Sequence, residues 1–391
     1  MRVLPQRDRY FGRLVGMSFA HFLNDGSSNY LPGILPAILI ALHEPVSMAG
    51  AIMAALMIGQ IWQPFLGWIA DRVGGKGLIV IGLSASSIGG ALLGFAQHNL
   101  AVLIALLLLV GVGNSMFHPQ ALAAVRSIVR ERQGLSLSFF LVGGELGRGI
   151  WPTVTSWIVV RWGIVDLWVT AIPALITLPF LFRMAPSLPK KERTGAKIKW
   201  SSHLFPMLSL VGYSGTRSLI TYGLVTFIPI LWHQNGGSLV SGASIITTLL
   251  AVGVIGNLSG GHFADRLGRR PVMLISSVLV MIFTPFFLFV SGAWIWIVAA
   301  LIGIMLFSSA PVAVLIGQDI FPENRSMGSG IALGLANGIG SLLVFVIGLF
   351  VTSQTITSVF WALAVAGLLS VVFSLMIPKG IMAHGNVVHR A

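Results

Sequence analysis

Long apolar runs alternate with short polar segments along the chain. A run of about 20 apolar residues is long enough to cross a bilayer as an α-helix. The pattern predicts twelve such helices, in two sets of six separated by a polar segment at 185–201. The predicted spans are 12–40, 47–69, 77–97, 99–124, 134–160, 163–183, 203–232, 240–263, 271–292, 293–317, 327–351 and 355–378. Prolines inside these runs indicate kinks, which neighbouring helices tolerate in lipid, at Pro32, Pro36, Pro119, Pro152, Pro173, Pro229 and Pro311.

A short motif occurs once in each set of six. The pattern Gly-x-x-Ala-Asp-Arg-x-Gly occupies Gly67–Gly74 and again Gly261–Gly268, with an offset of 194 residues in a chain of 391. In both copies an apolar run precedes the motif and another follows it. The sequence therefore predicts an all-α integral membrane protein with two pseudo-symmetric six-helix bundles, at 1–184 and 202–391, joined by a cytoplasmic linker at 185–201.

We expect the repeated motif to act as a conformational latch and not to touch substrate. Its aspartates can accept backbone N–H bonds at a helix start, where the helix dipole favours negative charge. Its arginines can bridge to carboxylates or helix carbonyl groups of the opposite half, and such bonds exist in only one conformation. The predicted latch residues are Gly67, Asp71, Arg72, Gly74, Gly261, Asp265, Arg266 and Gly268.

Composition supports a membrane protein and excludes several other classes. Hydrophobic residues make up 55% of the chain and charged residues 9%, against about 25% charged in soluble domains. The chain contains no cysteine, which excludes disulfides, thiolate metal sites and cysteine nucleophiles. We expect no cofactor and no enzyme activity, because the sequence has no Walker loop, nucleophile motif or metal cluster.

The net charge of +13 reflects membrane topology. Of the 24 basic residues, 21 fall in segments that the predicted helices place on one side of the bilayer, and only Arg161 lies in the alternate loops. The positive-inside rule then puts both termini and the linker in the cytoplasm, for a multi-pass protein of the cell inner (plasma) membrane. This placement argues against a nucleic-acid partner. The first helix is long and contains Asp25, so we expect it to be retained and not cleaved as a signal peptide.

Four charged residues lie at the predicted membrane depth: Asp25, Glu145, Arg148 and Arg217. Each costs about 2.5–3.5 kcal/mol at a helix centre on insertion scales, so each should face a cavity or a partner. These residues do not follow the repeat, since the offset of 194 places Glu145 on Ile339. We therefore expect the two halves to differ in function.

His21 and Asp25 lie four residues apart on one face of the first helix, with Asn24 beside them. A carboxylate next to an imidazole can carry a proton, so we assign His21 and Asp25 to proton coupling and Asn24 to substrate binding. Alternatively, Asp25 is structural, as a cap at a kink or a partner of a neighbouring helix. On the fourth helix, Asn114 and His118 lie one turn apart and are expected to line a cavity and bind substrate. We predict no metal site, because no second imidazole or carboxylate lies near His118 in sequence.

Glu145 and Arg148 lie three residues apart on one face of the fifth helix. One interpretation is a self-neutralising pair that fixes helix packing. In the other, Arg148 binds an anionic substrate while Glu145 carries a proton, and the two roles compete through their shared contact. Arg217, on the seventh helix, can hold a carboxylate or phosphonate with its guanidinium, or it can pair with Asp25.

These motifs resemble the major facilitator superfamily. Gly67–Lys76 and Gly261–Arg270 are similar to its signature loop and to the later echo of that loop. More narrowly, His21–Asp25, Gly113–Pro119 and Val142–Gly147 resemble the fosmidomycin resistance protein branch. The resemblance implies a proton-driven exporter with a central cavity between two six-helix bundles, alternating access and no use of ATP.

The resemblance also bears on the substrate. Fosmidomycin is a small phosphonate, which suits Arg148 and Arg217 as anion ligands. The chain departs from the antiporter motif of the fifth helix, since Arg148 stands where that motif has proline, and Trp151 and Pro152 replace its paired glycines.

The leading hypothesis is a secondary transporter, a proton-coupled exporter of a small anionic or zwitterionic organic compound of the drug or phosphonate efflux type. The alternative is a proton symporter or facilitator for an organic anion or a metal complex. A membrane sensor or scaffold that transports nothing is a third hypothesis, which would not require charges at membrane depth. The expected partners are a small-molecule substrate, protons and the lipid bilayer, with the chain acting as a monomer.

Overall fold

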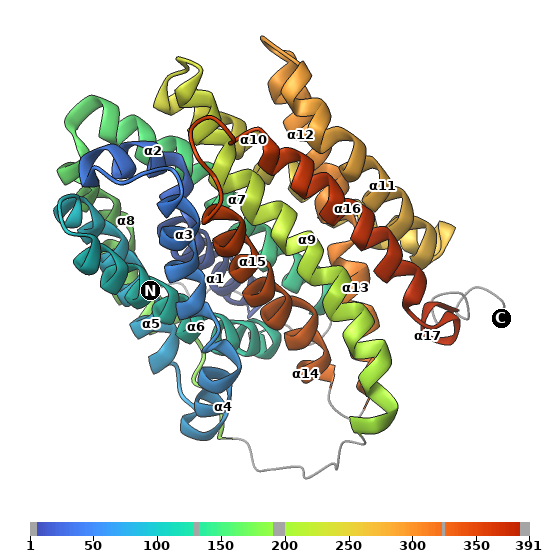
Figure 1. The fold of residues 1–391 in the computed structure, drawn as a ribbon. Coiled ribbons are helices and arrows are strands. Elements are labelled where there is room, and N and C mark those ends of the chain that lie inside the picture. Colours follow the sequence, from blue (N-terminus) through green and yellow to red (C-terminus); the bar gives the residue numbers. More distant parts are fainter. Residues whose placement is uncertain (1–5, 129–132, 191–199, 323–324, 384–391) are drawn as a thin grey trace. The chain divides into compact units, whose positions relative to one another are not determined.

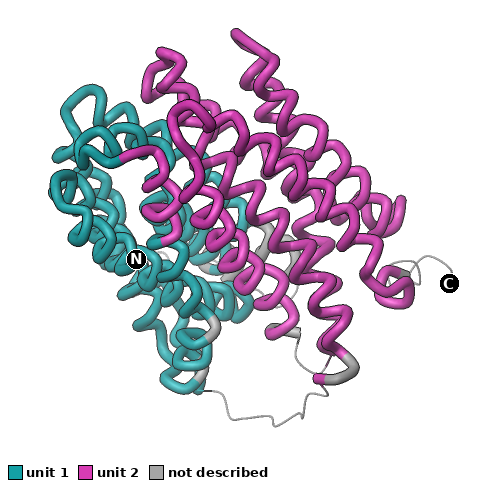
Figure 2. The backbone as a smooth tube through the Cα atoms, viewed as in Figure 1, with its two compact units in different colours: residues 1–44, 55–193 teal, residues 45–54, 194–391 magenta. Residues whose placement is uncertain are grey.

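All the elements of the computed structural model are helices, within the described residues 6–128, 133–190, 200–322 and 325–383 (Figure 1). Contacts between Cα atoms divide the chain into two compact units (Figure 2). Unit 1 comprises residues 1–44 and 55–193, and unit 2 comprises residues 45–54 and 194–391. The short segment 45–54 thus groups with the second half of the chain, although it precedes most of the first half in sequence.

Unit 1 holds the first eight α-helices and two short 3₁₀ helices, except that α3 begins in unit 2. Their bounds are α1 Gln6–Asn29, α2 Leu31–Leu42, α3 Met48–Gln60, α4 Gln63–Val73, α5 Gly77–Leu92, η1 Leu93–Ala96, α6 Leu100–Ile128, α7 Gln133–Trp162, η2 Ile164–Thr170 and α8 Ala171–Met184. The numbered helices can be followed from blue to green in Figure 1.

Unit 2 holds the remaining helices, including one π-helical turn, η5. Their bounds are α9 Trp200–Gln234, α10 Leu239–Leu267, α11 Arg269–Phe286, η3 Phe287–Phe289, α12 Trp294–Ser308, α13 Ala310–Ile320, α14 Arg325–Gly330, η5 Ile331–Leu335, α15 Ala336–Gly348, α16 Ser358–Met376 and α17 Lys379–Ala383. Buried residues of α9, α10, α11 and α13 form a continuous apolar core in this unit.

Each of the twelve predicted runs coincides with helix, and two of the proline positions mark breaks. The first run is divided at Tyr30, just before Pro32, and the run at 293–317 is divided at Ser309, just before Pro311. Each proline lies in the first turn of the helix that follows and has no backbone N–H to bond the turn before it, which explains both breaks. Elsewhere the helix continues through the proline, as at Pro119, Pro152 and Pro229.

Within the described residues, nine helical stretches are long and apolar enough to cross a membrane. Three predicted runs are outside this set: the first, which comprises α1 and α2, and those that correspond to α7 and to α9. These are also the helices that contain Asp25, Glu145, Arg148 and Arg217. Charged side chains lower the mean hydropathy of a helix. The residues that suggest function therefore also make their helices harder to recognise as membrane-spanning.

In unit 1, α1 and α7 pack closely because glycines of α7 face α1. A Cβ atom at Gly147 would lie 2.0 Å from the carbonyl oxygen of Phe22. A Cβ atom at Gly144 would lie 2.3 Å from Nε2 of His21. Both distances are far below a van der Waals contact, so only glycine fits at this close approach. The contact places the backbone of α7 directly against His21.

Candidate functional site

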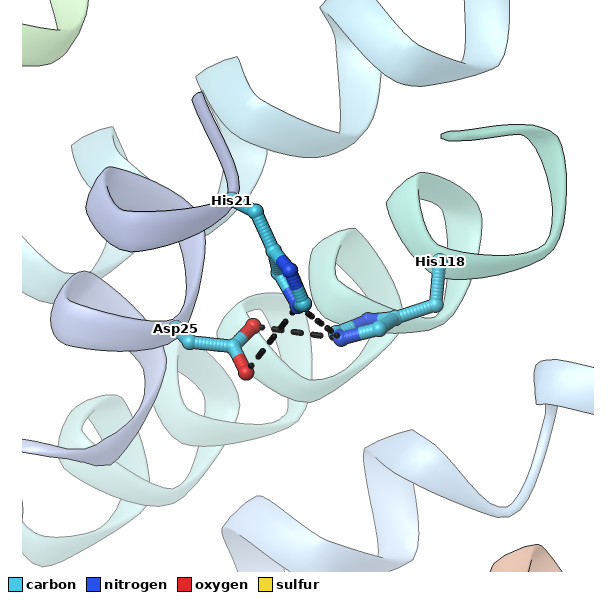
Figure 3. A group of neighbouring side chains, drawn as sticks. All are labelled: His21, Asp25 and His118. Carbon is cyan, nitrogen blue, oxygen red and sulfur yellow. Dashed lines mark hydrogen bonds and ion pairs between the residues drawn. The ribbon is translucent and has the colours of Figure 1, made fainter. Parts of the chain in front are cut away.

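Three side chains of unit 1 converge at one point (Figure 3). His21 and Asp25 are one turn apart on α1, and His118 reaches them from α6. His21 Nε2 lies 3.4 Å from Asp25 Oδ2, and His118 Nε2 lies 3.2 Å from Asp25 Oδ1. The two Nε2 atoms are 3.2 Å apart. We call these three residues the His–Asp–His cluster. The pairing of His21 with Asp25 agrees with the sequence prediction, and the approach of His118 was not predicted.

The other ring nitrogens determine what the cluster can bind. His21 Nδ1 lies 2.8 Å from the carbonyl oxygen of Phe140, and His118 Nδ1 lies 2.9 Å from that of Asn114. A carbonyl oxygen only accepts, so both Nδ1 atoms must donate. In neutral rings both Nε2 atoms then present lone pairs to each other and to the carboxylate. Three electron-pair donors this close require a cation between them.

One cation can contact the whole cluster, because one ligand atom from each residue lies within 4.8 Å of the others. No other group of three or more His or acidic side chains is this compact among the described residues. The sequence predicts no metal site because His118 has no such neighbour in sequence. In the fold it has two, both 93 or more residues away in the chain.

The surroundings hold the cluster in place. Asn24 is fully buried, and its amide nitrogen donates to Asp25 Oδ1 at 3.0 Å while its amide oxygen accepts from Ser86 of α5 at 2.7 Å. The ring of His21 stacks on Phe140 with a centroid distance of 4.1 Å. Asp25 and His118 keep 15% and 17% of their side-chain surface exposed, whereas His21 keeps 3%. Asn24 therefore orients Asp25, and the exposed side of the cluster is formed by Asp25 and His118.

The predicted ion pair of α7 is present. Arg148 donates from Nη2 to Glu145 Oε2, and each side chain is about one-fifth exposed. Arg148 also lies close enough to His118 to interact with it electrostatically. Asn114, predicted to bind substrate, is buried, and its carbonyl group orients His118. Unit 1 therefore combines the His–Asp–His cluster with a neighbouring, neutralised guanidinium.

Arg217 of α9 is buried in unit 2 with 7% of its surface exposed. Its Nη2 donates to the carbonyl oxygens of Met305 at 2.7 Å and Leu306 at 2.6 Å, near the end of α12. Nε and Nη1 have no hydrogen-bond partner among the residues that the structure describes. The bonds to α12 were not predicted. The predicted alternative, a pairing with Asp25, would join the two units and stays a prediction.

In unit 1 the repeated motif ends a helix and is tied to the chain that follows α8. Gly74 ends α4 with a φ of 66°, and its carbonyl oxygen accepts from Gln120 of α6 at 3.0 Å. Gly75 and Leu188 exchange two backbone hydrogen bonds, of 2.7 and 3.0 Å. The Arg72 guanidinium lies over the ring of Trp68, 3.6 Å from its centroid. The predicted role of the Asp71 side chain lies outside the described part of the structure.

In unit 2 the equivalent loop has an ion pair that the sequence did not predict. Gly268 ends α10 with a φ of 90°. Directly after it, Arg269 donates from Nη1 to Asp319 Oδ2 at 2.6 Å and to the carbonyl oxygen of Ile381 at 3.0 Å. Arg270 donates to the carbonyl oxygen of Ile377 at 2.5 Å. The described contacts of this loop thus come from the two arginines after the motif.

The motif aspartates are expected to accept backbone N–H bonds at a helix start, and this stays a prediction. Asp71 and Asp265 lie in the last turns of α4 and α10, because both helices continue until a glycine with positive φ ends them. The negative end of the helix dipole does not favour a carboxylate there. Bridges from Arg72 and Arg266 to the opposite half would join the two units and stay predictions. Gly67 and Gly261 lie within α4 and α10.

Membrane-length apolar helices with charged residues buried in their middles are characteristic of a membrane transporter. The model of the Major Facilitator Superfamily matches residues 17–234 and 210–384, so the chain belongs to this superfamily. The predicted all-α membrane fold is thereby confirmed. The chain is a multi-pass membrane transporter and not an enzyme.

Comparisons with individual proteins agree. A fosmidomycin resistance protein of Escherichia coli (strain K12) is 27% identical over 365 residues, which cover 90% of this chain and 89% of the relative. An uncharacterized MFS-type transporter of Bacillus subtilis (strain 168) is 26% identical over 382 residues, covering 93% and 92%. The solved structure of a peptide transporter in complex with sulfate has a TM-score of 0.75 at 14% identity, covering 97% of this chain and 99% of that one. This structural similarity establishes a shared fold.

Proposed function

We propose that the chain is a proton-coupled secondary transporter that exports a small anionic or zwitterionic organic compound by alternating access. The observation that supports coupling to a cation is the convergence of His21 Nε2, His118 Nε2 and the Asp25 carboxylate, whose contacts are 3.2 to 3.4 Å long. A proton is the simplest such cation, since an Nε2–H of either ring can donate to the carboxylate oxygen that this ring faces or to the Nε2 atom of the other ring. Protonation of either ring gives a charge-assisted hydrogen bond to Asp25.

The charged groups around the cluster are few. The helices packed against α1 are α5, α6, α7 and α8. Along α5 there is no charged residue, and α6 and α8 have theirs near their last turns, at Arg126 and Arg183. On α7 the described charged residues are Glu145, Arg148 and Arg161, and Arg161 lies in the last turn. Among the described residues of these four helices, Glu145 and Arg148 are therefore the charges that can adjust the proton affinity of the cluster. Glu145 is the second proposed proton carrier.

The arginines at membrane depth support an anionic group on the substrate. Arg148 of unit 1 offers one position for such a group, in competition with Glu145, and Arg217 of unit 2 offers another through donors without a described partner. A zwitterion suits exchange for protons, because its cationic group would compete with the proton for the His–Asp–His cluster. Mutual exclusion at one site is the requirement for antiport. The relative from Escherichia coli is named a fosmidomycin resistance protein, and resistance to a compound is consistent with its export.

Symport is the second candidate, and the Glu145–Arg148 pair favours it. An anion on Arg148 would release Glu145 from its partner, and the released carboxylate would then bind a proton more readily. Anion and proton would in that case be loaded together. The two candidates therefore differ in whether substrate and proton exclude or assist each other.

Transport into proteoliposomes distinguishes the two candidates. With fosmidomycin as the first probe, we expect accumulation when the interior is acidic and the exterior neutral, because protons then leave as the solute enters. A protonophore should abolish it. Accumulation only with an acidic exterior would establish symport. A lack of flux in either direction for fosmidomycin and a panel of small phosphonates and carboxylates would contradict transport and support a sensor or scaffold.

We propose that both termini and the 185–201 linker are cytoplasmic in the inner membrane. The native chain has no cysteine, so single cysteines can be labelled without background. In intact cells we expect Ser353→Cys, in the exposed segment between α15 and α16, to react with a membrane-impermeant maleimide. Ser187→Cys, in the exposed segment after α8, should react only after permeabilisation. The reverse labelling pattern would overturn this orientation.

A further inference from the structure

The guanidinium of Arg217 is anchored on one side and unused on the other. Its Nη2 binds two backbone carbonyl groups, while Nε and Nη1 have no partner within the described residues. Guanidinium has five N–H donors, so three remain on those two nitrogens. A buried, charged donor without a partner is strongly unfavourable. These donors can therefore bind a ligand that has several acceptor atoms.

The anchor fixes the direction of Arg217 without neutralising its charge. Met305 and Leu306 lie near the end of α12, just before the break at Ser309 and Pro311. Proline at this break removes a backbone donor. Arg217 donates to carbonyl groups beside it, and these acceptors carry no net charge. The full positive charge of the guanidinium is thus held in one orientation, which is the pre-organisation that anion binding requires.

The described acidic residues of unit 2 are not placed to neutralise Arg217. The sequence of this unit has three, Asp265, Asp319 and Glu323. Asp265 lies in the last turn of α10, and Asp319 pairs with Arg269 near the end of α13. Glu323 lies outside the described residues. A carboxylate from unit 2 is therefore not the partner of Arg217 in the described structure.

Two hydroxyl groups lie on the same face of α9 as Arg217. Tyr213 and Ser214 precede it by four and three residues, which places them one helical turn away. Both are more than nine-tenths buried, and neither hydroxyl has a hydrogen-bond partner among the described residues. The guanidinium carbon lies 6.0 Å from the centroid of the Tyr213 ring. Hydroxyl and guanidinium groups can all donate to one set of oxygen atoms.

We propose that Arg217, Ser214 and Tyr213 form an oxyanion site in unit 2, which binds the phosphonate, phosphate or carboxylate group of the transported solute. The proposal deepens the proposed function, on which it rests for the statement that the anion belongs to the cargo. Binding itself depends on neither a gradient nor a direction of transport. It can therefore be measured in the purified full chain.

The test measures binding of methylphosphonate, inorganic phosphate, sulfate and acetate to the detergent-solubilised protein. Ionic strength is held constant, and chloride is the reference anion. Isothermal titration calorimetry gives affinity, and the anion-induced rise in thermal unfolding temperature gives a second readout. We expect saturable binding of at least one oxyanion to the wild type. Arg217→Gln, which keeps donors for the α12 carbonyl groups but removes the charge, should weaken it more than tenfold. Arg217→Lys should retain part of it.

Tyr213→Phe and Ser214→Ala test the site without touching the charge. Each removes one hydroxyl that has no other described partner, so each should fold normally and weaken the same oxyanion severalfold. The matched control is Arg161→Gln, which removes an exposed arginine at the end of α7 and should leave affinity unchanged. If Arg217 serves only to bond α12, Arg217→Gln will leave anion affinity at the wild-type value. That result, or an absence of oxyanion binding to the wild type, would overturn the site.

The transport assay separates this proposal from the proposed function. Proton-driven transport with a wild-type KM in Arg217→Gln would reject the site and leave the function standing. Oxyanion binding that requires Arg217, in a protein that transports none of the probes, would reject the function and leave the binding site standing. Binding of methylphosphonate without binding of inorganic phosphate would identify an organic anion as the ligand.

Discussion

Asp25→Asn is expected to abolish proton-driven accumulation in proteoliposomes while leaving exchange of labelled for unlabelled solute intact. The asparagine side chain fits the same space and can still contact His118, but it cannot balance an imidazolium charge. Accumulation should fall to the level of empty liposomes. Solute exchange at equilibrium requires no net proton movement, so this readout should survive and show that the variant is folded.

Glu145→Gln provides the comparison on α7, and Asp166→Asn provides the control. Asp166 lies in η2, outside the cluster, where it accepts a hydrogen bond from Trp168, so its substitution should leave coupling unchanged. Loss of proton dependence in Glu145→Gln with normal coupling in Asp25→Asn would move the coupling role from the His–Asp–His cluster to α7. Loss in both variants would mean that the proton passes through both sites.

Gly147→Ala is expected to destabilise the protein more than any other single methyl addition on the face of α7 that meets α1. The added Cβ would lie 2.0 Å from the backbone carbonyl oxygen of Phe22, and backbone cannot rotate away as a side chain can. Overpacking of this kind costs about 1–3 kcal/mol of unfolding free energy, and sometimes more. Thermal unfolding in detergent, followed by tryptophan fluorescence, should show a clear decrease in midpoint.

Gly12→Ala is the matched control for this substitution. Gly12 also lies in a helix, α1, but a Cβ atom there has no heavy atom within 4 Å. Alanine is favoured over glycine in a helix by about 1 kcal/mol. Gly12→Ala should therefore be neutral or slightly stabilising. An equal decrease in both variants would show that the loss of stability does not come from the α1–α7 contact.

The fold could be predicted from the sequence because hydropathy and the repeat are both local signals. The runs of apolar residues coincide with helices, and the breaks near Tyr30 and Ser309 follow from the prolines just beyond them. The end of α10 could not be inferred in the same way, since the predicted run stops at 263 and the helix continues to Leu267. The glycine that ends α10 comes three residues after Asp265, so the helix includes the aspartate.

The sites were only half predictable, for a physical reason. His21 with Asp25, and Glu145 with Arg148, are neighbours on one helix, so helical spacing identifies them. His118 is brought to Asp25 by the packing of α6 on α1, which no local pattern encodes. The partners of Arg217 are backbone carbonyl groups. Every residue has such a group, so the sequence contains no signal that could have identified them.

The hydrogen bond from His21 to the Phe140 carbonyl group has a further consequence. Phe140 belongs to α7, so the ring of an α1 histidine is oriented by a different helix. Any motion that separates α7 from α1 would remove this acceptor and change the cation affinity of the cluster. Thermodynamic linkage is reciprocal. Separation of α7 from α1 weakens the binding of a cation to His21, Asp25 and His118 by a certain free energy. Binding of the cation therefore makes the separation less favourable by the same free energy.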